Sequence, residues 1–111
     1  MKKTLVIVSA VVLAACGASK SVVPTQSDAD RMSAKFEGGY TLAQLEQGKT
    51  LYENNCGICH SLYAANSRVE EAWNQIVPKM VMKVNKKSGK EALNASDEEL
   101  IRRYLVTMSV K

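Results

Sequence analysis

The chain has 111 residues, which is enough for one small domain and too few for two. It carries 15 Lys and Arg against 11 Asp and Glu, a formal charge of +4. Lys2 and Lys3 belong to an N-terminal segment that we expect to be removed, which leaves 13 basic residues and a charge of +2. This small excess gives little support to binding of nucleic acid or of polyanions in general.

Residues 1–15 have the pattern of a bacterial secretory signal peptide. A short basic start precedes an apolar run, residues 5–13, that is too short to span a bilayer as a helix. The segment ends in Leu13-Ala14-Ala15-Cys16, which resembles the lipobox of bacterial lipoproteins. That resemblance implies cleavage before Cys16 and a thioether-linked diacylglycerol on its sulfur. The protein would then be lipid-anchored to a membrane of the bacterial cell envelope, with its domain outside the cytoplasm. The alternative is an ordinary signal peptide that contains a cysteine or is cleaved further on.

Residues 16–40 are predicted to be the lipidated cysteine and a flexible tether. The stretch is rich in Ser, Ala and Asp, contains Pro24, and has few bulky apolar residues and no sustained period. The alternative is that part of it packs on the domain, which the four-residue spacing of Met32 and Phe36 would allow.

Residues 41–111 are predicted to form one all-α domain, because three segments have a helical period and none alternates as a strand does. The first helix covers about residues 42–54 and leads directly into a cysteine motif. The second has the clearest period, over residues 69–84, with a predicted capping box of Ser67 and Glu70 and a predicted kink or restart at Pro78. The third begins at Ser96, with Glu99 completing a second predicted capping box.

The apolar stripes of the three helices predict the core. Their members, in chain order, are Leu42, Leu45, Gly48 and Tyr52; then Val69, Ala72, Trp73, Ile76, Val77, Met80, Val81 and Val84; then Leu100, Ile101, Tyr104, Leu105 and Met108.

The most informative motif is Cys56-Gly57-Ile58-Cys59-His60. Two thiols three residues apart, followed at once by an imidazole, are what covalent attachment of haem requires. His60 is the only histidine of the chain, so that it is the candidate proximal iron ligand. A zinc site would need further Cys or His ligands at fixed spacing downstream, and none follow. A thioredoxin-like motif would need a βαβ context, whereas the segments here have a helical period. With Cys16 assigned to lipid, and Cys56 and Cys59 to haem c, no thiol is left for a disulfide.

Residues 42–111 resemble a small bacterial class I cytochrome c. The resemblance rests on Gly48 and Tyr52 before the motif, on the motif itself, on the run Trp-Asn-Gln-Ile-Val-Pro-Lys-Met at residues 73–80, and on the closing helix at residues 101–105. It implies three to four helices wrapped around one covalent haem, with the first and last helices crossing closely at Gly48 and Tyr104. It also implies a low-spin electron carrier that is not an enzyme, has no small-molecule substrate and exchanges electrons with redox proteins.

The ligand opposite His60 decides between electron transfer and ligand binding, since a thioether raises the potential and closes the site. Met80 is the favoured candidate, because it lies on the apolar stripe and fits the run of the family. Met82 lies roughly 200° away on an ideal helix, but a kink at Pro78 would re-aim it, and it is the alternative. Met108, or no methionine, completes the possibilities.

Two further features stay open. The indole of Trp73 either donates to a haem propionate or is a core group with its N–H at the surface. The lysines at positions 79, 83, 86, 87 and 90 form either a solvated face or a docking patch for an acidic partner.

The expected function is a membrane-tethered electron shuttle. The alternatives are a haem c subunit of a membrane oxidoreductase complex and a haem sensor with an open distal site.

Overall fold

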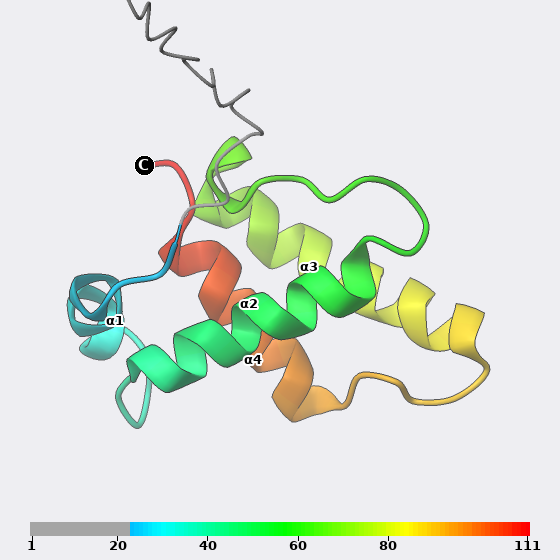
Figure 1. The fold of residues 1–111 in the computed structure, drawn as a ribbon, viewed down its shortest axis with the longest axis horizontal. Coiled ribbons are helices and arrows are strands. Elements are labelled where there is room, and N and C mark those ends of the chain that lie inside the picture. Colours follow the sequence, from blue (N-terminus) through cyan, green and yellow to red (C-terminus); the bar gives the residue numbers. More distant parts are fainter. Residues whose placement is uncertain (1–22) are drawn as a thin grey trace, which may run out of the picture.

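A computed structural model of the chain describes residues 23–111, and within them the fold is all-helical with no strand (Figure 1). Four α-helices and one short 3-10 helix follow one another as α1 (Gln26–Ser33), α2 (Leu42–Cys56), η1 (Ala65–Ser67), α3 (Glu70–Ser88) and α4 (Ala95–Thr107). Helix α4 crosses α2 and also packs against α3, so that these three helices enclose the core. The prediction of an all-α domain is confirmed. No helix of residues 23–111 is long and apolar enough to cross a membrane.

The predicted apolar stripes point into the core, except that Val69, which caps α3, is 48% exposed. Helix α2 buries Leu45, Gly48 and Tyr52, as its spacing predicts. Helix α3 buries Trp73 and three valines at helical spacing, and Met80 packs at the margin of the core. From α4 the core receives Ile101, Tyr104, Leu105 and Met108, whereas Leu100 is only half-buried.

The predicted start signals of α3 and α4 are wrong. Val69 caps α3 without a side-chain hydrogen bond, because the Ser67 hydroxyl donates to the carbonyl of Ala64 within η1. At α4 the cap is Asn94, whose side chain accepts from the amide of Asp97 at 2.9 Å, two residues before the predicted Ser96. The Asp97 carboxylate accepts in return from the Asn94 amide, which completes a capping box.

Helix α3 is continuous through Pro78, so that a restart at this residue is excluded. Proline has no N–H and cannot donate to the carbonyl of residue 74, one turn earlier. Pro78 is exposed, which leaves that carbonyl within reach of solvent. Gly89 ends the helix in the left-handed conformation, with φ of 70°.

Residues 25–40 are not a tether, and this corrects the predicted domain boundary. Thr25 and Asp28 form a capping box that starts α1. The apolar residues of this segment recur every three to four positions and are buried in the same core as the other helices: Ala29, Met32, Phe36 and Tyr40. The alternative that Met32 and Phe36 pack on the domain is therefore confirmed. Residues 1–22, with the predicted signal peptide and Cys16, lie outside the described part of the chain.

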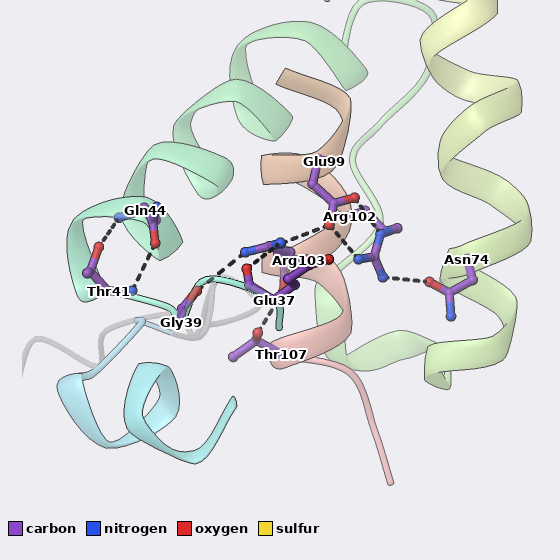
Figure 2. Close-up of polar contacts among 9 residues, drawn as sticks. All are labelled: Glu37, Gly39, Thr41, Gln44, Asn74, Glu99, Arg102, Arg103 and Thr107. Carbon is purple, nitrogen blue, oxygen red and sulfur yellow. Dashed lines mark hydrogen bonds and ion pairs between the residues drawn. The ribbon is translucent and has the colours of Figure 1, made fainter. Parts of the chain in front are cut away.

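An arginine pair on α4 holds the segment after α1 in place (Figure 2). Arg103 donates to the carbonyls of Glu37 and Gly39, at 3.3 and 3.4 Å, and its guanidinium carbon lies 4.9 Å from the centre of the Phe36 ring. Glu99 accepts from both Arg102 and Arg103, at 2.6 and 2.8 Å, and so orients the two guanidinium groups. Helix α1 therefore lies at one end of the molecule, against α2 and α4, while the loop after α2 and the end of α3 form the opposite end (Figure 1).

Candidate cofactor attachment site

The cysteine motif lies where α2 ends. Cys56 is the last residue of the helix and is buried, Gly57 caps it, and Cys59 and His60 follow in an exposed loop. Cys56 and Cys59 are both free thiols. Burial raises the pKa of the Cys56 thiol to about 11, so that it is protonated at neutral pH.

The motif forms one wall of an apolar cavity, and α3 forms the other. This cavity, of about 170 Å³, is lined by Asn55, Cys56, Cys59, His60, Met80, Lys83 and Val84. A second cavity of about 150 Å³ adjoins it, shares Asn55, Cys59 and Val84, and extends the space toward Ile58, Lys87, Ser88 and Ala92. The fold thus brings the two thiols and the imidazole of the motif together with a thioether that lies 20 residues after His60 in the sequence.

The methionines of residues 23–111 differ clearly in position. Met80 lines the larger cavity, while Met82, two residues on, is 65% exposed. Met108 is buried in the core at the end of α4, and Met32 belongs to the core side of α1. Among these four residues, Met80 is the one that lines a cavity with Cys56, Cys59 and His60.

The imidazole of His60 has one nitrogen engaged. Its Nδ1 lies 2.8 Å from the carbonyl oxygen of Ser61. Because a carbonyl can only accept, Nδ1 carries a proton in this contact, so that in the neutral ring Nε2 is the nitrogen with the lone pair. A neutral imidazole with a free Nε2 is the form that ligates a metal.

The loop after His60 is fixed to the core by aromatic side chains. The Tyr52 hydroxyl donates to the carbonyl of Tyr63 at 2.5 Å, and the indole N–H of Trp73 donates to the carbonyl of Ala65 at 2.8 Å. The rings of Tyr52 and Trp73 pack edge to face, with centres 6.3 Å apart. Burial raises the pKa of Tyr52 to about 12, so that its hydroxyl stays protonated. Trp73 is fully buried with its N–H satisfied by backbone, so that neither a free donor for a propionate nor a surface N–H is found.

Apolar side chains are exposed around the motif. Ile58, Leu62 and Tyr63 on the loop are between 39 and 56% exposed. A cluster of this kind beside an apolar cavity marks a surface that a partner or a bound group covers.

The lysines at positions 79, 83, 86, 87 and 90 give this end of the molecule a positive charge. All five are exposed, and the ion pairs found among residues 23–111 involve none of them. Lys83 and Lys87 line the two cavities, and the Lys87 ammonium lies 3.8 Å from the Cys59 sulfur.

Several residues of the site are not apparent from the motif. Asn55 and Val84 line both cavities, and their only sequence signals are a position next to Cys56 and a place on the α3 stripe. Tyr63 and Arg68 carry no sequence signal. Within residues 23–111, no group of three or more His, Cys, Asp or Glu side chains is placed to hold a metal ion.

Comparison of the chain with family models, curated proteins and solved structures finds no match.

Proposed function

We propose that this chain is a small monohaem c-type cytochrome, anchored by a lipid on Cys16, that transfers electrons at a membrane of the bacterial envelope. One observation carries the proposal: Cys56, Cys59, His60 and Met80 line the same cavity. The two ligands expected from the sequence for opposite sides of an iron thus belong to one site.

The donor set fits haem c. The free thiols of Cys56 and Cys59 would form the two thioether links, Nε2 of His60 would be the proximal ligand, and the Met80 sulfur would be the distal one. When bound, haem would supply an iron that alternates between the ferric and ferrous states. The walls of this space are mostly apolar, and the exposed Ile58, Leu62 and Tyr63 provide the apolar surface that a flat porphyrin would cover.

The protein's own part is to bias the iron and to close the site. A methionine thioether favours the ferrous state and occupies the position that small ligands would need. Met80, half-buried on a continuous helix and lining the same cavity as His60, would be the residue that provides this ligand. For this reason we favour electron transfer over a haem sensor with an open distal site.

A redox protein with an acidic surface is the partner that we propose for the site. Of the five lysines at positions 79 to 90, Lys83 and Lys87 line the cavities, and none of the five has a carboxylate partner among residues 23–111. Complementary charge of this kind raises association rates and makes them depend on salt. The identity of the donor and acceptor does not enter the proposal.

The second candidate, a fixed haem c subunit of a membrane oxidoreductase complex, is favoured by the length of the anchor segment. Because Thr25 already caps α1, at most eight residues separate the fold from Cys16. Fully extended, such a segment reaches about 30 Å, compared with on the order of 80 Å for a tether that lasted to residue 40. The domain would therefore meet partners on its own membrane. Purification in mild detergent separates the two cases, since a stoichiometric complex indicates a subunit and a lone chain indicates a carrier.

Covalent attachment is the direct test of the proposal. In wild-type protein, haem should remain on the chain through SDS denaturation and acid-acetone extraction. The double variant Cys56→Ala, Cys59→Ala should be exported without haem, and Cys16→Ala should keep it, since Cys16 is not part of the motif. Haem that is extracted from the wild type would refute the proposal.

A further inference from the structure

Tyr63 and Arg68 form a stacked row that ends at His60. The ring centres of His60 and Tyr63 are 5.2 Å apart, with the planes inclined by 49°. The guanidinium carbon of Arg68 lies 4.6 Å from the centre of the Tyr63 ring and 5.8 Å from that of the buried Trp73. The row therefore links the core of the protein to the imidazole.

The position of Arg68 is an unusual one for a cation. Its Nε is buried without a hydrogen-bond partner, and the ion pairs found within residues 23–111 do not include it. An unpaired buried donor destabilises the fold, and a cation–π contact offsets that cost at best about equally. The stacking therefore gains little stability and instead holds a fixed positive charge next to the attachment loop.

Tyr63 is held from the core side, whereas His60 is not. The carbonyl of Tyr63 accepts from the buried Tyr52 hydroxyl, and two residues later the carbonyl of Ala65 accepts from the Trp73 indole. His60 itself is exposed, and its one hydrogen bond is to the adjacent Ser61. The ring of Tyr63 is thus the neighbouring group that restricts rotation of the imidazole about its side-chain bonds.

We infer that Tyr63 and Arg68 are positioning residues for His60. Tyr63 sets the orientation of the imidazole plane. Arg68 places a positive charge near His60, which would disfavour the ferric state of the iron that His60 would ligate, because that state is the more positive one. This inference rests on the proposed function, because it assigns the two residues a role toward the iron ligand.

The test uses full-length protein with haem attached, and two readouts: the electron paramagnetic resonance spectrum of the ferric form, which reports ligand orientation, and the midpoint potential. Tyr63→Leu removes the ring and should change the spectrum, while Tyr63→Phe keeps the ring and should preserve it. Arg68→Gln should shift the ferric/ferrous equilibrium toward ferric by about tenfold, which is about 59 mV for a one-electron couple. Arg68→Lys keeps the charge and should shift it less.

Arg31→Gln, which removes one charge on α1 at the far end of the molecule, is the control and should leave both readouts unchanged. If Tyr63→Leu and Arg68→Gln carry covalent haem with wild-type spectrum and potential, the inference is wrong although the proposed function stands. If Arg68→Gln changes only the pH dependence of the potential, the guanidinium acts on a carboxylate of the bound group, and the assignment to His60 is overturned. Should Arg68→Gln fail to mature, a wild-type spectrum in Tyr63→Leu alone refutes the positioning role. Wild-type protein that holds no covalent haem contradicts the proposed function instead.

Discussion

Gly48 lies directly against the backbone of Leu100, where α2 crosses α4. A Cβ added at Gly48 would stand 2.2 Å from the Leu100 carbonyl oxygen and 2.9 Å from the Cβ of Tyr104. No side-chain rotation relieves this contact, because the first atom belongs to the backbone of a helix. The close approach expected at Gly48 and Tyr104 is thus present, and any larger residue would push the two helices apart.

Gly48→Ala should therefore strongly destabilise the fold. Overpacking of a rigid contact costs about 1–3 kcal/mol, occasionally more, and we expect the upper end. Chemical denaturation of the purified protein measures the change in the free energy of unfolding. Gly89→Ala is the control, because nothing lies within 4 Å of a Cβ there and only the left-handed φ of 70° opposes it, at about 1 kcal/mol. Equal losses in the two variants would contradict the argument from the helix crossing.

Phe36 tests whether the segment before α2 belongs to the domain. The ring is buried, packs edge to face on Tyr40 with centres 5.0 Å apart, and lies under the Arg103 guanidinium. Phe36→Ala should lower the free energy of unfolding by about 3 kcal/mol, and Phe36→Leu by about 1 kcal/mol. If residues 25–40 acted only as a tether, both variants would unfold like the wild type.

Glu99 should make stability depend on pH in the acid range. Hydrogen bonds from Arg102 first, and then from Arg103, lower the pKa of its carboxyl from 4.5 to about 2. The pair therefore stabilises the fold fully above about pH 4.5, and this contribution is lost as the pH falls through about 2. Since Glu99 is partly exposed, solvent screening limits the effect to about 1 kcal/mol. Thermal unfolding of the wild type and Glu99→Gln should differ at pH 6 and converge near pH 2. A constant difference would exclude the ionised carboxylate as its cause.

Sequence reasoning located the helices whose apolar residues recur at the helical period, because burial of one face requires that period. It gave the packing of the α1 segment only as an alternative to a tether, since four buried residues within a polar, eight-residue helix and its connector are too few to stand out by composition. It chose the wrong caps at Ser67 and Ser96, because several capable side chains lie within two or three residues and the choice depends on the local backbone. At the site, Cys56, Cys59 and His60 follow from local spacing. Asn55, Tyr63 and Arg68 depend on how the loop and α3 pack, which no local pattern encodes.

Cys16, outside the described residues, is predicted to carry the membrane anchor. Wild-type protein should partition with membranes and incorporate a fatty-acid probe. Cys16→Ala should either stay uncleaved at this position or be released as a soluble form, because it lacks the sulfur that would carry the lipid. Metabolic labelling followed by fractionation measures both properties. A wild-type chain that is unlabelled and freely soluble would support an ordinary signal peptide.

Met80 and Met82 give the sharpest test of the site, because they are two residues apart on one helix and lie on different sides of it. Met80 lines the cavity with His60, whereas Met82 is 65% exposed. The wild-type ferric protein should be low-spin, with the weak red absorption of sulfur-ligated haem, and the ferrous form should bind carbon monoxide poorly. Met80→Ala should abolish that absorption, admit carbon monoxide and lower the potential, since a thioether favours ferrous iron.

Met82→Ala should leave the absorption, the carbon monoxide affinity and the potential nearly unchanged. Helix α3 is continuous through Pro78, which leaves no break by which Met82 could turn toward His60 while Met80 turns away. If the two variants nevertheless exchange their behaviour, binding of haem must rotate the second half of α3. If neither variant changes the spectrum while haem stays covalently attached, the distal position is open or held by another group. In that case a ligand-binding haem sensor replaces the electron carrier as the better account of this chain.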